Sequence, residues 1–193
     1  MISPSHRFIF VHIGRTGGTS LERLAGVGLT RDPRTAPAGN TDFPDKHATF
    51  DYYYRTFPEE FSSFFKFTII RNPYDRLVSA WLWRNSVMKD QRCSLSDFAL
   101  TRPGVWGYRS RLQLDNMDFG ASIKALDYIA RYENLEKDME FICNKIDLDF
   151  EKFPHTNRTK SGHYRDYYDD HTLELVTDLF KFDIEYFGYR FEE

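Results

Sequence analysis

The chain has few of the residues on which disulfide-rich or metal-dependent proteins rely. Its 193 residues include only two cysteines, Cys93 and Cys143, and these form no Cys-x-x-Cys pair. Small secreted domains held by disulfides are far richer in cysteine, and zinc sites need closely spaced Cys and His ligands. A disulfide scaffold is therefore excluded, and we expect two free thiols and no bound metal.

A dominant charge, a long apolar segment and internal repeats are also missing. The 26 Lys and Arg residues nearly balance the 29 Asp and Glu residues, which gives a net charge of −3. Nothing in this balance indicates nucleic acid or an anionic membrane as a partner. The first predicted strand begins by Phe8, which leaves no room for a signal peptide or membrane anchor before it. The oligomeric state stays open.

The sequence does contain ample material for one hydrophobic core. Hydrophobic residues make up 41% of the chain and aromatic residues 17%, enough apolar surface to offset the entropy cost of ordering the backbone. A chain of this length, without long linkers, suits one folding unit. We predict a single domain spanning residues 1–193.

Predicted strands alternate with predicted helices along the chain. Three apolar, β-rich runs at residues 7–13, 64–70 and 127–132 are typical of buried parallel strands. Helices are predicted at residues 19–24, from 57 on, at 74–87 and 94–100, after a cap at Asn134, and at 171–186, with a long loop over 25–45. This order predicts an α/β fold whose parallel sheet carries helices on both faces. Ligands bind such sheets at the carboxyl ends of the strands.

A glycine-rich turn joins the first predicted strand to the first predicted helix. Gly14, Gly17 and Gly18 lie in this turn, and Thr19 and Ser20 follow directly. Backbone N–H groups converge at such a turn and the helix dipole adds positive potential, so the segment suits a phosphate. It lacks the Gly-x4-Gly-Lys-Ser/Thr spacing of an ATPase P-loop. A plain turn without a ligand is the simpler alternative.

The second predicted strand ends in another set of anion-binding groups. Arg71 stands at the strand end, Asn72 and Pro73 open the next helix, and Ser79 follows on that helix. An arginine offers paired charge-assisted hydrogen bonds and a serine hydroxyl adds a donor, so the two predict a clamp for a second phosphate. Ser79 could instead be a small residue packed on the sheet. Arg76 is expected to be structural and paired with a carboxylate.

Both turns have counterparts in a known family. The stretches Arg15-Thr-Gly-Gly-Thr-Ser20 and Arg71-Asn-Pro-Tyr-Asp-Arg-Leu-Val-Ser79 resemble the two donor-binding signatures of sulfotransferases that use 3′-phosphoadenosine-5′-phosphosulfate (PAPS), carbohydrate sulfotransferases above all. The resemblance continues at residues 132–136, 164–168 and 187–189 and leaves about 87–125 unmatched. It implies a P-loop NTPase-like three-layer sandwich with a central parallel sheet. It also implies PAPS as the donor co-substrate, without a metal.

The resemblance assigns a role to each motif. Arg15 takes the position of the family's usual loop lysine and would neutralise charge on the bridging oxygen as the sulfuryl group leaves. Arg71 and Ser79 would bind the 3′-phosphate of the donor. Two further sets of residues would complete donor binding: the 5′-phosphosulfate loop of Thr16, Gly17, Gly18, Thr19 and Ser20, and the late basic loop with Arg158, Lys160 and Ser161.

Transfer to a hydroxyl needs a general base, and histidine suits this role at neutral pH. His47 lies in a Lys-His-x-Thr segment that resembles the base-carrying segment of glycan sulfotransferases, so the resemblance assigns it as the base. The alternative for His47 is an exposed loop histidine. His12, within the first strand, is expected to be a core residue whose hydrogen bonds are satisfied.

The acceptor is expected to contact the unmatched middle of the chain, residues 83–115. This segment combines aromatic residues that can stack on sugar rings with several arginines, a mixture that suits an anionic or polyhydroxylated acceptor. Its members are Trp106, Tyr108, Arg84, Arg92, Arg102, Arg109 and Arg111. We expect a hydroxyl-bearing glycan, with protein tyrosine or a small alcohol as alternatives. Since Golgi relatives carry a membrane anchor, its expected absence predicts a cytoplasmic, bacterial enzyme.

Two other classes of protein remain open from the sequence. A P-loop phosphotransferase such as a nucleotide kinase would share the fold, but it would require Mg²⁺ and prefer ATP, and the missing Gly-Lys-Ser/Thr speaks against it. A non-catalytic nucleotide- or glycan-binding module would keep the phosphate clamp and need no base. Replacing His47 by alanine would leave such a module unchanged.

Overall fold

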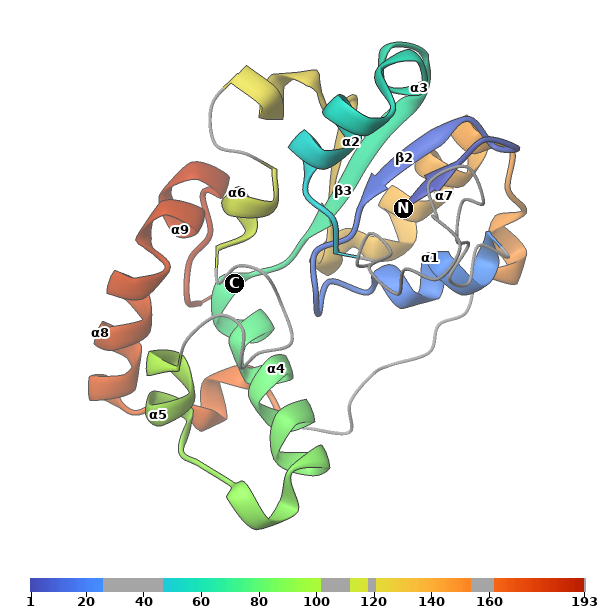
Figure 1. The fold of residues 1–193 in the computed structure, drawn as a ribbon. Helices are drawn as coiled ribbons and strands as arrows, with labels where there is room; N and C mark the ends of the chain where they lie inside the picture. Colours follow the sequence, from blue (N-terminus) through green and yellow to red (C-terminus); the bar gives the residue numbers. More distant parts are fainter. Residues whose placement is uncertain (26–46, 102–111, 118–120, 154–161, 193) are drawn as a thin grey trace.

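A four-stranded sheet forms the centre of the structure (Figure 1). Its strands are β1 (Ile2–Ser3), β2 (Phe8–Val11), β3 (Phe65–Ile70) and β4 (Tyr128–Arg131), in that spatial order. β1 pairs antiparallel with β2, and β2, β3 and β4 run parallel. The computed structural model describes residues 1–25, 47–101, 112–117, 121–153 and 162–192.

Helices cover both faces of the sheet, in agreement with the predicted α/β fold class (Figure 1). Phe8 and Phe10 of β2 pack toward one pair of helices, and Ile9 and Val11 toward another pair. Because both faces of β2 and β3 are buried, these strands are apolar at nearly every position. The first pair of helices is α1 (Gly18–Leu24) and α7 (Leu135–Ile146), and the second pair is α2 (Phe50–Thr56) and α3 (Pro58–Ser63).

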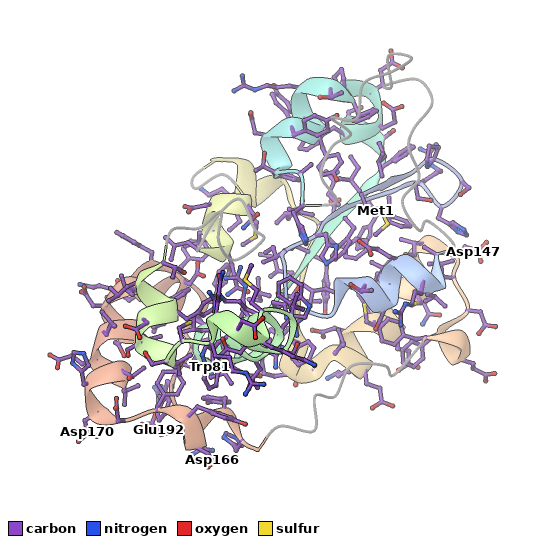
Figure 2. All side chains as sticks on the ribbon, turned by 60° about the horizontal axis from the view of Figure 1, so that its bottom comes forward. Met1, Trp81, Asp147, Asp166, Asp170 and Glu192 are labelled. Carbon is purple, nitrogen blue, oxygen red and sulfur yellow. The ribbon has the colours of Figure 1, made fainter. Side chains whose placement is uncertain are left out.

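Most of the remaining α-helices form a second cluster beyond the carboxyl end of β3 (Figure 1). Their shared core contains Leu77, Phe98, Val176 and Phe180, all fully buried. Figure 2 shows Trp81 in this cluster, far from Met1 on the sheet side. The α-helices of this cluster are α4 (Pro73–Val87), α5 (Leu95–Leu100), α8 (Asp170–Leu179) and α9 (Lys181–Phe187), and the 3₁₀ turns η1 (Lys89–Gln91) and η6 (Tyr164–Tyr167) adjoin α4. Helix α6 (Gln113–Asn116) and the 3₁₀ turn η3 (Ala121–Ala125) contribute to a separate core with the end of α9, and η4 (Tyr132–Asn134) and η5 (Phe150–Lys152) pack beside α7.

The structure corrects the predicted helix over residues 171–186, which is two helices. The chain leaves helical geometry at Phe180, with φ −110° and ψ 14°, and α9 begins at the next residue. The apolar spacing continues across the break, so periodicity could not detect it. Asp183, on the second of these helices, is completely buried.

Two smaller differences concern helix starts. Helix α2 was not predicted, and the side chain of Thr49 caps it by accepting from Tyr52 N at 3.3 Å. Asn134 precedes α7 as predicted, but its side chain makes no capping hydrogen bond. The chain enters α7 through the 3₁₀ turn η4, so Asn134 lacks the extended backbone that side-chain capping requires.

Both thiols are free, as predicted. Cys143 is fully buried in the core beneath the sheet, whereas Cys93 is half-buried beside α4. Within the described ranges, no helix combines the length and apolar character needed to cross a bilayer.

Candidate functional site

The glycine-rich turn after β2 has unusual backbone geometry. Arg15 adopts φ 66° and Gly17 φ 89°, both left-handed, and such a conformation is uncommon for arginine. The hydroxyl of Thr16 donates to Ile13 O at 2.8 Å, and Ser20 N donates to Gly17 O at 3.0 Å as α1 begins. Strained backbone of this kind persists where the surroundings enforce it, and it is frequent at ligand sites.

Gly18 is required for a different reason, because the turn lies directly against the ring of His12. A Cβ atom at Gly18 would lie 2.4 Å from His12 Cδ2, 2.5 Å from Nε2 and 2.9 Å from Phe10 Cε1. These distances are far below contact, so only glycine fits. The turn is therefore fitted to a specific side chain of β2 as well as to its own backbone.

The second turn, after β3, is anchored by residues from distant parts of the chain. Asn72 Oδ1 accepts from Tyr74 N at 3.0 Å and caps α4, while Asn72 Nδ2 donates to Arg190 O at 2.9 Å. Asn72 N donates to Glu133 Oε1 at 2.6 Å, and Glu133 Oε2 accepts from the hydroxyl of Tyr189 at 3.1 Å. Glu133 thus anchors the second turn from the 3₁₀ turn that follows β4.

The backbone of Arg71 is held by a glutamine that sequence reasoning missed. Gln113 pairs with it twice: Arg71 N donates to Oε1 at 2.8 Å, and Nε2 donates to Arg71 O at 2.9 Å. Gln113 N and Leu114 N in turn donate to the carboxylate of Asp183, at 2.7 and 3.0 Å. Burial raises the pKa of Asp183, and these two N–H groups and the charge of Arg76 oppose the rise.

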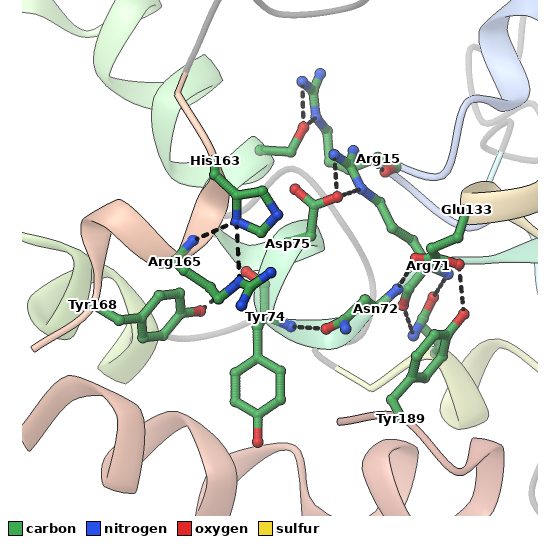
Figure 3. A network of polar contacts seen from close by, with 12 residues as sticks. Arg15, Arg71, Asn72, Tyr74, Asp75, Glu133, His163, Arg165, Tyr168 and Tyr189 are labelled. Atoms are coloured by element: carbon green, nitrogen blue, oxygen red, sulfur yellow. Dashed lines mark hydrogen bonds and ion pairs between the residues drawn. The ribbon is translucent and has the colours of Figure 1, made fainter. Parts of the chain in front are cut away.

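The guanidinium of Arg71 is engaged on three sides. Nε and Nη2 lie 2.8 and 2.7 Å from Asp75 Oδ2, and Nη1 donates to Arg15 O at 3.1 Å. Its Cζ atom lies 4.1 Å from the centre of the Tyr132 ring, a cation–π contact. Figure 3 shows Arg15 and Arg71 near each other with Asp75 against Arg71. Neither Asp75 nor Tyr132 was predicted, although Asp75 follows Arg71 by four residues.

Arg15 reaches from the first turn to the second. Its Nε and Nη2 donate to Ser79 Oγ at 3.1 and 2.9 Å. Ser79 is buried, with 4% of its surface exposed. The neighbouring Arg76 is also buried and donates through Nε to Gly14 O at 3.0 Å, in keeping with its predicted structural role. The structure therefore brings Arg15, Arg71 and Ser79 together at the carboxyl ends of β2 and β3.

His47 is buried, so the alternative of an exposed loop histidine is wrong. Only 6% of its surface is exposed, and its Nδ1 lies 2.8 Å from the backbone oxygen of His12. A carbonyl oxygen only accepts, so Nδ1 carries the proton and Nε2 keeps the lone pair. His12 is a satisfied core residue, as predicted: it is 3% exposed, and its Nδ1 lies 2.7 Å from Glu22 Oε1.

The segment that follows the late basic loop packs on the start of α4. The hydroxyl of Tyr168 donates to Tyr74 O at 3.0 Å, and His163 Nδ1 accepts from Arg165 N and Nε at 3.3 Å (Figure 3). Several predicted residues lie outside the described ranges: Arg158, Lys160, Ser161, Trp106, Tyr108, Arg102, Arg109 and Arg111. Over the part of the chain that is described, no three or more His, Cys, Asp or Glu side chains form a metal-binding group.

Comparison with known proteins gives one match. A family model described as the sulfotransferase family matches residues 1–110 and 120–190 of the chain. The match includes both turns, the His47 segment and the residues that anchor the second turn, Glu133 and Tyr189. No significant match is found among curated proteins or among solved structures.

Proposed function

Since the chain belongs to the sulfotransferase family, we propose that it transfers a sulfuryl group from PAPS to a hydroxyl group of a carbohydrate acceptor. The observation that carries this proposal is the meeting of Arg15 from the first turn with Ser79 and Arg71 from the second. Two guanidinium groups at adjoining strand ends suit a donor that carries two separate phosphate groups.

The first turn fits the phosphosulfate end of such a donor. Gly17 and Gly18 carry no side chain that could hold the ligand away from the backbone, and Gly18 allows the turn to sit against β2. In this proposal Thr16, Thr19 and Ser20 line the loop that orients the sulfuryl group. Thr16 fixes the turn through Ile13 O, so its hydroxyl supports the loop from within.

The second turn fits the 3′-phosphate. Arg71 and Ser79 are its proposed ligands, and both are already held in place by neighbours. Asp75 Oδ2 pairs with Nε and Nη2 of Arg71 and so holds the Arg71 guanidinium in the direction of the first turn. Arg158, Lys160 and Ser161 are proposed to complete the site around the 3′-phosphate and the adenine.

Catalysis would depend on positioning and electrostatics. Bound PAPS supplies an activated sulfuryl group: its sulfur–oxygen bond to the 5′-phosphate breaks as a bond forms to the acceptor oxygen. His47 takes the acceptor proton at Nε2, the nitrogen left basic by the Nδ1 hydrogen bond to His12 O. Arg15 stabilises the negative charge left on the phosphate oxygen. A monoanionic sulfuryl group requires less charge neutralisation than a γ-phosphate, so we propose that no metal takes part.

These residues would belong to one domain, residues 1–193, with the P-loop-like three-layer sandwich of the family. Calorimetric titration of adenosine 3′,5′-bisphosphate without metal tests the donor site. We expect binding that Arg71→Ala weakens about 10- to 100-fold, because charge-assisted hydrogen bonds are lost. Arg55→Ala is the matched control, since Arg55 is an exposed arginine paired with Asp51 on α2. Preference for ATP with Mg²⁺ would instead support a phosphotransferase.

The acceptor and the base are tested by transfer of radiolabelled sulfate from PAPS to a panel of oligosaccharides, tyrosine peptides and small alcohols. We expect label on an oligosaccharide, lost on His47→Ala while binding of the bisphosphate is kept. Bisphosphate binding without transfer to any member of the panel would favour a non-catalytic binding module.

A further inference from the structure

His12 connects the two halves of the proposed reaction centre. It is the residue that follows β2, and it lies between helix α1, which begins at the glycine turn, and His47. Its ring contacts α1, and both its ring and its backbone contact His47. The mechanism above uses only the backbone oxygen of this histidine and gives its imidazole ring no task.

Helix α1 contacts the ring of His12 at two points, Glu22 and Gly18. Glu22 Oε1 lies 2.7 Å from Nδ1, and Gly18 lies so close to Cδ2 and Nε2 that no Cβ fits between them. Gly18 and Glu22 are four residues apart and so share one face of α1. Because a carboxylate accepts, Nδ1 of His12 carries the proton of this hydrogen bond. The orientation of the ring relative to the donor turn is thereby fixed.

The other side of His12 fixes His47. The backbone oxygen of His12 accepts from His47 Nδ1 at 2.8 Å, and the two ring centres lie 4.6 Å apart with the planes tilted by 53°. The first contact selects the tautomer of His47, and the second sets the direction of its ring. Glu22 places its carboxylate on the ring of His12, which in turn packs against the ring of His47.

We propose that His12, held by Glu22, is a positioning residue that sets the proton-accepting nitrogen of His47 relative to the donor turn. The inference rests on the proposed function, in which His47 is the base. Misplacing a catalytic group by about 1 Å costs on the order of 100-fold in rate. The contacts of Glu22 and His12 that position His47 should therefore have a measurable effect on turnover. Glu22 lies on α1, so it can be substituted without altering β2 or the backbone of His12.

Glu22→Met tests the contact between Glu22 and His12. Methionine keeps the length and helix propensity of glutamate but removes the oxygen that accepts from His12 Nδ1. The primary measurement is the ¹⁵N spectrum of the histidine rings, in which His47 is assigned by comparison with His47→Ala. In the wild type we expect His47 as the single tautomer protonated at Nδ1. In Glu22→Met the backbone oxygen of His12 still accepts from His47 Nδ1, so we expect the same tautomer but shifted and broadened ring signals of His47, because the His12 ring packed against it is no longer held. In Glu22→Gln, whose amide oxygen still accepts, we expect the wild-type signals.

Glu140→Ala, an exposed glutamate on α7, is the matched control and should leave the His47 signals unchanged. If Glu22→Met does not fold, Glu22→Ala removes the same acceptor without overpacking. Unchanged His47 signals in the folded Glu22→Met or Glu22→Ala protein would overturn the inference.

Turnover separates this inference from the proposed function. With the acceptor found in the transfer panel, we expect Glu22→Met to lower kcat about 10- to 100-fold, with a smaller change in the KM for PAPS. Full turnover in His47→Ala would show that the proposed base is wrong. The ring signals of Glu22→Met would still decide whether Glu22 and His12 position His47.

Discussion

The guanidinium of Arg15 donates from both Nε and Nη2 to the hydroxyl of Ser79, across 64 residues of sequence. This contact joins the two turns and fixes the position of the serine oxygen beside Arg15. If Ser79 binds the 3′-phosphate, its hydroxyl is already oriented by Arg15.

We predict that Ser79→Ala weakens binding of adenosine 3′,5′-bisphosphate about 10-fold, as expected for one hydrogen bond to a charged group. Calorimetric titration measures the change. Ser86→Ala is the control on the same helix, since the Ser86 hydroxyl is exposed and donates to Trp83 O. Equal affinities for wild type and Ser79→Ala would remove Ser79 from the donor site.

Gly18→Ala should abolish bisphosphate binding, because the new methyl group would overlap the ring of His12 and displace the turn. Gly188→Ala provides the comparison, since no atom lies within 4 Å of its Cβ position and only its φ of 68° is unfavourable. We expect Gly188→Ala to lower the free energy of unfolding by about 1 kcal/mol and to leave binding unchanged. Titration together with thermal unfolding distinguishes the two effects.

Asp183→Ala should destabilise the protein strongly. It leaves the N–H groups of Gln113 and Leu114 without their carboxylate, and breaking a buried charged network costs about 3–5 kcal/mol. Urea unfolding measures this loss. Asp178→Ala, at an exposed position of α8, should stay within about 0.5 kcal/mol of the wild type. A similar loss in both variants would contradict a specific role for Asp183.

The stability of the fold should fall in alkaline solution because of Cys143. Burial raises the pKa of its thiol to about 11, with a smaller contribution from Asp149. Above about pH 9 the unfolded thiol loses its proton while the folded one keeps it, so the free energy of unfolding decreases as pH rises toward 11. The decrease amounts to about 3 kcal/mol.

Urea unfolding in the presence of a reductant, at about pH 8 and about pH 10.5, measures this dependence on pH. Cys143→Ala is the control, because tyrosines that titrate in the same range contribute equally to both proteins. The same slope in wild type and variant would show that the thiol is not responsible.

The three parallel strands and both turns could be predicted because their signals are local, whereas the short antiparallel strand β1 was not predicted. β2 and β3 are buried on both faces and are therefore apolar runs, and the bend between β2 and α1 demands glycine at positions 17 and 18. The break at Phe180 could not be predicted, because the apolar spacing is the same on both sides of it. His47 is buried against His12, the residue that follows β2 and lies 35 positions earlier in the chain. The residues next to His47 in the sequence therefore give no sign of its burial.

The supports of the site were harder to find than its proposed ligands. Gln113 holds Arg71 from 42 residues away, and Glu133 holds Asn72 from 61 residues away. Glutamine has no propensity that marks such a role, so Gln113 was missed. Glu133 lies within residues 132–136, a stretch that resembles the family, but its contact with Asn72 is not visible in the sequence. Side chains that bind a ligand follow local geometry, whereas side chains that hold them in place follow the tertiary fold.

The bond from Asn72 to Arg190 O spans 118 residues, so the second turn is completed only by a late part of the chain. During synthesis at about 5–20 residues per second, roughly 6–24 s pass between the two residues. In that interval β2, β3 and the glycine turn already exist on the nascent chain, while the cap of α4 lacks its last partner. A ribosome paused before residue 190 would therefore carry all four strands together with a second turn that lacks this hydrogen bond.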